Sequence, residues 1–328
     1  MSAVDFDIDA ITALNNASTA LNSYAPIFIY IFGTVGNCLN ILVLSQRTLR
    51  SNPSAIYFLA SSLAGIIVII SGLTSRMMSG YNGDLTLTVG WICKIRNVVL
   101  YSFRTVVFWM IVCATIDRWL SSSTKVNYRQ MSNMKNVRRS IIAVMIYTCI
   151  INSPILYCYE ANVDGTLRSC YGSTYSCRLI TDLIYAFGIV LLPLTLMTIF
   201  GLLTIRNVRQ VQTRVQTITA INSNSRSTTT TTIKRDQELF RMLLIQITLL
   251  LLFNGPHAIQ KVYTSFSSNT TSDNLTDATT TLIFNIFTLL AFVASSMPFY
   301  IYTLIGGSLF RSALYNLFKI FFHKLTCH

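Results

Sequence analysis

Long, continuous apolar runs dominate this chain. Seven of them are long enough to cross ~30 Å of hydrocarbon as helices that rise ~1.5 Å per residue. They are residues 25–45, 54–75, 93–119, 139–158, 179–205, 239–265 and 280–304. Apolar and polar residues do not alternate as in barrel strands, and no long repeat is evident. The pattern predicts an all-α membrane protein, a seven-transmembrane helix bundle.

A shorter pattern follows the last run. Between residues 308 and 322, apolar residues recur at helical spacing beside Arg311 and Lys319. Such a segment is typical of an amphipathic helix that lies on a membrane surface. The predicted organisation is an N-terminal segment (1–24), the transmembrane domain (25–304), and an amphipathic helix with a tail (305–328).

The composition agrees with a membrane protein. Of the 328 residues, 52% are hydrophobic and only 11% are charged, whereas a soluble domain carries about 25% charged residues. This excludes a water-soluble enzyme. A pI near 9.5 would fit a nucleic-acid binder, but the apolar fraction would not. We therefore predict that the protein lies in a lipid bilayer and that it has no nucleic-acid partner.

The charges are distributed unevenly between the two sides of the predicted membrane. With the N-terminus outside, the inner loops and tail hold 18 basic and three acidic residues, and the rest of the chain holds seven and nine. Positive charge marks the cytoplasmic side, so we predict a multi-pass plasma-membrane protein with an extracellular N-terminus and a cytoplasmic C-terminus. Three glycosylation acceptors fall on predicted outer segments: Asn16, Asn269 and Asn274.

Several short motifs stand at specific places on these spans. Asp117-Arg118-Trp119 ends the third span, and Cys93 lies 25 residues before Arg118, which is about 37 Å of helix. Further motif residues lie within the first, second, fifth, sixth and seventh spans: Gly36-Asn37, Leu59-Ala60, Pro193, Pro256 and Pro298. Together these features resemble the rhodopsin-like (class A) G-protein-coupled receptors over residues 25–322. The resemblance implies a receptor, not an enzyme, that transduces a ligand signal to a heterotrimeric G protein.

A narrower resemblance concerns the ligand. Residues 192–194, 200–207, 236–244 and 299–304 are similar to invertebrate FMRFamide-type neuropeptide receptors, which implies an extracellular peptide. Two alternatives remain open. One is a chemosensory receptor for small molecules with the same fold. The other is a transporter or channel, which would place acidic residues near span centres, where this chain has none.

The resemblance also implies roles for cysteines near the outer face. Cys93 would form a disulfide with the second outer loop, with Cys170 as its partner. Cys158 and Cys177 either form a second bridge or stay free thiols. Cys327, beyond the last span, is a candidate either for palmitoylation or for a spare thiol.

By the same resemblance, Arg118 would be the activation switch. A guanidinium at the inner boundary needs a partner; Asp117 is adjacent, and Asp236 stands 20 residues before Pro256, at the inner end of span six. Breaking such a contact would free span six to swing outward. Tyr302 is the predicted equivalent of the conserved tyrosine in span seven.

The sequence also departs from the family pattern. Leu63 stands where many members have an aspartate in span two, so no carboxylate remains for a sodium ion. Asn254 replaces the aromatic residue before the span-six proline, and span four has no tryptophan. Span seven reads Met297-Pro298 in place of Asn-Pro. These changes put the usual internal relay in doubt.

Cationic and polar residues predict a ligand cavity between spans three and six. Arg104 lies 11 residues after Cys93, about 16 Å into the membrane, where an unpaired cation costs ~2.5–3.5 kcal/mol. Its candidate partners are Asp182, Asn254 or a ligand carboxylate. Other predicted binding residues are Tyr101, His257, Gln260 and Lys261, the last three on one helical face.

The charge of the ligand stays open from sequence. The cationic cavity suits an acidic group, whereas an amidated Arg-Phe peptide would direct its guanidinium to Asp182, Glu160 or Asp164. Two ligand classes are disfavoured. Leu100 replaces the aspartate of amine receptors, and residues 280–304 hold no lysine for retinal. No cofactor, metal or catalytic motif is predicted.

Overall fold

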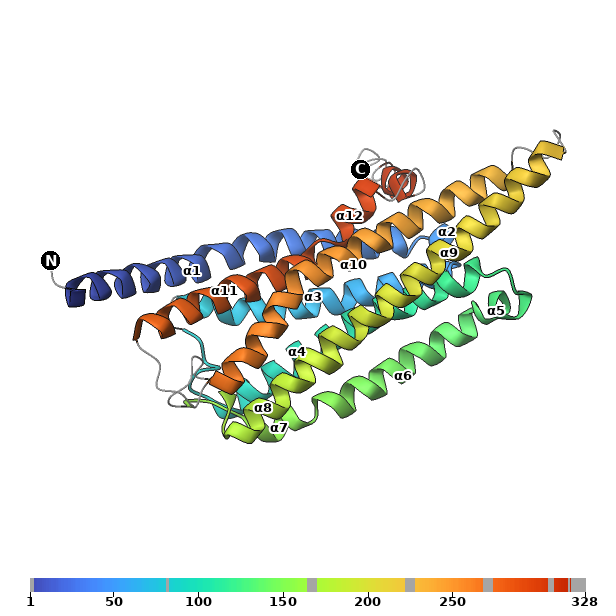
Figure 1. Cartoon of the computed structure of the whole chain (residues 1–328). Coiled ribbons are helices and arrows are strands. Elements are labelled where there is room, and N and C mark those ends of the chain that lie inside the picture. The colour runs from blue at the N-terminus through green and yellow to red at the C-terminus, as the bar shows by residue number, and fades with distance from the viewer. Residues whose placement is uncertain are drawn as a thin grey trace, which may run out of the picture.

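The computed structural model describes residues 3–80, 83–163, 170–221, 228–267, 274–305, 310–317 and 319, with only the backbone at 3–7, 48, 80, 211–240, 242, 267 and 305. Seven helices in these ranges are long and apolar enough to cross a membrane. They lie side by side as one elongated bundle (Figure 1). The predicted fold class, an all-α seven-helix bundle, is confirmed.

The helices follow the predicted runs but extend further. Their bounds are α1 (Ala3–Leu44), α2 (Arg47–Arg50), α3 (Pro53–Gly80), α4 (Gly90–Ser122), α5 (Val126–Met131), α6 (Met134–Asn152), α7 (Pro154–Cys158), α8 (Tyr175–Leu183), η1 (Ile184–Leu191), α9 (Leu192–Ile221), α10 (Thr228–Ser267), α11 (Asn274–Ser296) and α12 (Pro298–Ile305). The helix of the first span thus continues through most of the predicted N-terminal segment. Helices α9 and α10 project together beyond one end of the bundle (Figure 1).

Prolines explain the breaks within spans. Pro154 and Pro298 each begin a new helix, where their missing N–H leaves no hydrogen bond unmade. Pro256 lies inside α10. Before Pro193 the helix widens into the π-helix η1, in which residue i+5 would donate to residue i. Pro193 cannot donate to the Gly188 carbonyl, which instead accepts from Tyr147 Oη (3.2 Å) and Trp109 Nε1 (3.4 Å).

A small hairpin and two disulfides close one end of the bundle. The strands β1 (Tyr159–Glu160) and β2 (Tyr171–Gly172) pair antiparallel. One disulfide joins Cys93 of α4 to Cys170, and the other joins Cys158 to Cys177. We call this the disulfide end. The opposite end, where Asp117 lies near the end of α4, is the Asp117 end.

Helix α4 runs through the middle of the bundle and is its most buried span. Helix α3 packs closely against it and against α11: a Cβ built on Gly72 would lie 2.3 Å from the Phe292 ring, so only glycine fits at this position. The register of α3 differs from the sequence-based alignment. Leu63 is 51% exposed and faces away from the bundle, whereas a Cβ on Gly65 would lie 3.0 Å from Asn37 Oδ1. The interior position opposite Asn37 is therefore Gly65, which also lacks a carboxylate.

Part of the predicted amphipathic segment is helical. Residues 310–317 form a helix with Phe310 and Ala313 buried against the bundle. Gln46 Nε2 donates to the Ala313 carbonyl at 2.8 Å, and Arg311 donates to the carbonyls of Thr303 and Leu304. Its position on a membrane surface stays a prediction.

Candidate ligand cavity and switch

A buried ion pair stands at the centre of the disulfide end. Lys261 Nζ of α10 lies 2.6 Å from Asp182 Oδ1 of α8, with side chains 1% and 0% exposed. The other carboxylate oxygen of Asp182 accepts hydrogen bonds from Ser265 Oγ at 2.6 Å and from the Tyr171 hydroxyl. Asp182 therefore has a cationic partner and donors to both oxygens, as a buried carboxylate requires.

Arg104 does not have the partner that the sequence suggested. Its Nη1 donates to the Tyr185 hydroxyl at 3.2 Å, and its guanidinium lies over the Phe292 ring, 4.9 Å from the centroid. Asp182 belongs to Lys261 instead. The hypothesis that Arg104 pairs with Asp182 or Asn254 is thus wrong for the described structure, in which Asn254 Nδ2 donates to the Leu250 carbonyl.

Tyrosines surround the two cations. Lys261 Nζ lies 5.0 Å from the Tyr101 ring centroid and 4.7 Å from that of Tyr185, distances at which cation–π attraction operates. Tyr159 of the hairpin packs edge-on against Tyr101. Burial, with Tyr101 and Asp182 nearby, raises the pKa of Tyr159 well above its usual value, so its hydroxyl stays neutral at physiological pH.

A cavity of about 320 Å³ that is open to solvent lies beside this cluster. Four of the predicted ligand-binding residues line it: Tyr101, Arg104, His257 and Lys261. The other three, Asp182, Asn254 and Gln260, are buried but lie outside its lining. Gln260 Nε2 donates to the Thr280 carbonyl at 3.1 Å, and His257 Nδ1 lies 3.4 Å from Thr288 Oγ1.

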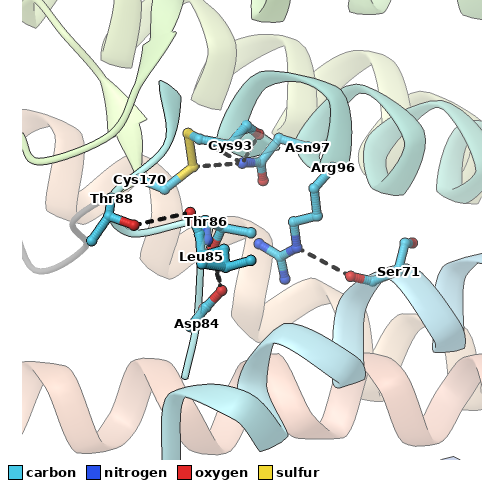
Figure 2. The surroundings of a disulfide bond; sticks show 9 residues. All are labelled: Ser71, Asp84, Leu85, Thr86, Thr88, Cys93, Arg96, Asn97 and Cys170. Carbon is cyan, nitrogen blue, oxygen red and sulfur yellow. Dashed lines mark hydrogen bonds between the residues drawn. A yellow bond between two sulfur atoms is a disulfide. The ribbon is translucent and has the colours of Figure 1, made fainter. Parts of the chain in front are cut away.

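The cavity also has charged walls that were not among the predicted binding residues. Arg76 of α3, Arg96 of α4 and Asp84 of the connection between them line it. Figure 2 shows Arg96 directed toward Ser71 of α3, close to the Cys93–Cys170 disulfide. Asn97 Nδ2 donates to Cys170 Sγ at 2.9 Å and to the Cys93 carbonyl. The sequence signal for these arginines was their position inside or at the edge of apolar spans.

The Asp117 end has a different arrangement. Asp117 accepts hydrogen bonds from Ser54 Oγ at 2.5 Å and Ser132 Oγ at 2.6 Å, one on each carboxylate oxygen. Arg118 Nη2 lies 3.4 Å from Asn52 Oδ1, which can accept a weak hydrogen bond. The predicted switch residues are therefore linked to the start of α3 and to the segment after α5. The side chain of Asp236 lies outside the described residues.

Tyr302 connects α12 to α10. Its buried hydroxyl donates to Gln246 Oε1 at 2.7 Å, and its ring packs against Phe58 of α3. Sequence reasoning had placed Tyr302 in the switch but had missed Gln246. No pattern marked this glutamine except that it is a polar residue within the apolar part of α10.

Some predicted residues contribute nothing to these clusters. Asn16 and Asn274 are exposed, as glycosylation sites must be, and Asn269, Asp164 and Cys327 lie outside the described residues. Glu160 is exposed on β1. Among the described residues no group of His, Cys, Asp and Glu could hold a metal ion.

Comparison with known proteins identifies the family. The family model "7 transmembrane receptor (rhodopsin family)" matches residues 36–302. The chain belongs to this family. Its members are receptors rather than enzymes, in agreement with the predicted receptor class.

Individual relatives of this receptor are distant. It is 24% identical to galanin receptor 2a of Danio rerio over 140 residues, which is 42% of this chain and 38% of that protein. It is also 24% identical to the N-arachidonyl glycine receptor of Homo sapiens over 176 residues, 53% of this chain and 50% of that protein. The receptor thus matches at most half of the length of these relatives, and neither is an FMRFamide-type receptor by name.

Proposed function

We propose that this receptor binds an extracellular ligand in the cavity at the disulfide end and activates a heterotrimeric G protein at the Asp117 end. The observation that carries the proposal is the separation of two polar clusters on one helix. Tyr101 and Arg104 of α4 line the cavity, and Asp117 and Arg118 lie at the other end of the same helix. A rearrangement of α10 around Pro256 would affect both.

The orientation in this proposal rests on charge. The loops at the Asp117 end carry most of the basic residues of the chain, and basic loops stay cytoplasmic. The disulfide end, with two cystine bridges, would face the oxidising exterior. Exposed Asn16 and Asn274 offer a test: Asn→Gln at either position would remove a glycosidase-sensitive gel shift if the disulfide end faces outside.

For the ligand we propose a chemical class and no specific molecule. An extracellular neuropeptide, as in the FMRFamide-type resemblance, is our first candidate, and a small molecule sensed by a chemosensory receptor is the second. The two relatives are named for different ligands, galanin and N-arachidonyl glycine, so their names support neither candidate over the other.

A cell-based G-protein activation screen with a peptide library tests the function. We expect at least one activating ligand, and we expect Arg118→Ala to abolish activation at unchanged surface expression. Arg129→Ala is the matched control, because Arg129 is an exposed arginine at the same end of the bundle. A variant lacking Arg118 that still signals would contradict the switch assignment, and ion current without any G protein would contradict the receptor function.

A further inference from the structure

Two arginines on α4 have the same surroundings but different hydrogen bonding. Arg96 and Arg104 both line the cavity. Arg96 donates from Nε to the Ser71 carbonyl at 3.1 Å (Figure 2). Its Nη2 donates to the Gly72 carbonyl, also at 3.1 Å. The same two nitrogens of Arg104 are buried and have no hydrogen-bond partner among the described residues.

The unpartnered edge of Arg104 cannot be explained by exposure to water. The side chain is only 2% exposed. Among the described residues its one hydrogen bond runs from Nη1 to Tyr185, and Asp182, the acidic group that the sequence offered, pairs with Lys261. A buried charge with unmade hydrogen bonds is costly, and folded proteins retain such a group mainly where a ligand or water completes it.

The two free nitrogens have a specific geometry. Nε and Nη2 form one edge of the planar guanidinium, with two parallel N–H groups spaced to match the two oxygens of a carboxylate. Two further arginines of the lining favour an anionic ligand. Arg76 and Arg96 are cationic, Lys261 is paired with Asp182, and Asp84 is the one acidic residue in the described lining.

We propose that the ligand of this cavity carries a carboxylate, which binds the Nε–Nη2 edge of Arg104. This inference rests on the proposed ligand-binding function and specifies its chemistry. Arg104 lies 11 residues along α4 from Cys93, about 16 Å of helix, and Phe292, Leu100 and Phe284 line the cavity around it. The carboxylate is therefore at the end of a molecule that has an apolar portion next to it.

The proposal separates the ligand classes that the sequence left open. An amidated Arg-Phe peptide has no terminal carboxylate to bind Arg104, and Asp182, one of the acidic residues predicted for its guanidinium, is already bound by Lys261, Ser265 and Tyr171. A peptide with a free C-terminus and a small carboxylic acid both present the required group.

The proposed binding of a carboxylate is tested without a G protein by measuring how probe molecules bind to the purified receptor in zwitterionic nanodiscs. The probes are two matched pairs, benzoate with benzamide and a Phe-terminated tetrapeptide as free acid and as amide. The readouts are the thermal unfolding midpoint during titration and the affinity. We expect at least one acid to bind about tenfold or more tightly than its amide, since a bidentate charged hydrogen-bond pair is lost with the amide.

Three variants identify the residue responsible. Arg104→Gln should remove the preference for the acid, and Arg104→Lys, which keeps the charge but not the paired N–H edge, should retain only part of it. Arg178→Gln is the matched control: Arg178 of α8 also has a buried Nε without a hydrogen-bond partner among the described residues, but it does not line the cavity, so this variant should keep the preference.

The outcomes distinguish the two sources of the carboxylate, a small acid and a peptide C-terminus. They also distinguish the carboxylate proposal from the proposed receptor function. A preference for benzoate alone supports a small carboxylic acid, and a preference for the peptide acid alone supports a peptide C-terminus. The carboxylate proposal is overturned if neither acid stabilises the receptor more than its amide, or if Arg104→Gln keeps the preference. If acids bind through Arg104 but activate no G protein, the carboxylate proposal holds and the proposed function fails.

Discussion

Asp182 and Asp117 are both buried aspartates, but they lie at opposite ends of the bundle and are held differently. Asp182 is 0% exposed and has a lysine, a serine and a tyrosine as partners. Asp117 is 6% exposed, and among the described residues its two oxygens accept hydrogen bonds from two serine hydroxyls. One carboxylate is thus paired with a cation, and the other is hydrogen-bonded to hydroxyl groups within the described part of the chain.

The difference has a physical consequence for each end. Separating Asp182 from Lys261 would leave two buried charges without partners, so the disulfide end is expected to hold one arrangement. Replacing two hydroxyl groups around Asp117 by water or by another donor costs much less. The Asp117 end is therefore the end that can rearrange, as the proposed switch requires.

Removal of Asp182 should have the largest effect. Asp182→Ala removes the acidic partner of the buried Lys261, which we expect to lower the free energy of unfolding by ~3–5 kcal/mol. The unfolding midpoint of the purified receptor measures this. Exposed Asp9 of α1 provides the control, with little change expected for Asp9→Asn. The double variant Asp182→Ala/Lys261→Met should be more stable than Asp182→Ala; equal stability would contradict the ion-pair account.

Loss of one hydroxyl at Asp117 should have an intermediate effect. Ser54→Ala leaves Asp117 Oδ2 without its donor, and we expect ~1–3 kcal/mol of destabilisation, together with higher ligand-independent signalling. Basal G-protein activity at matched surface expression measures the second effect. Ser121→Ala is the control, because within the described part of the chain the Ser121 hydroxyl bonds to a carbonyl of its own helix. Unchanged basal activity in Ser54→Ala would argue against a role for this contact in the switch.

The corresponding change at Asp182 should be the smallest. Ser265→Ala removes one donor to Asp182 Oδ2, but the Tyr171 hydroxyl still donates to the same oxygen. We expect destabilisation of about 1 kcal/mol or less and no change in basal signalling. If Ser265→Ala lowers the unfolding midpoint as much as Ser54→Ala does, the two ends are equally tolerant and the contrast between them is wrong.

Sequence reasoning was most accurate where a signal is local. The apolar runs predicted all seven spans, and the cysteines near one face included the four that the structure joins in two disulfides. The register of span two was wrong: the Leu59-Ala60 pair placed the position at Leu63, which is 51% exposed. Only packing against Asn37 shows that Gly65, not Leu63, faces the interior.

The sequence by itself determined that this chain crosses a membrane seven times, because the length of each apolar run is enough to show a span. It also determined that Arg104, Lys261 and Asp182 are charges in apolar surroundings, where they are energetically unfavourable without partners. Which charges meet was decided only by the tertiary structure. Lys261 and Asp182 are 79 residues apart, and Tyr185 and Arg104 are 81 apart. Such pairs depend on how helices rotate and pack against one another, and that packing leaves one guanidinium edge for a ligand.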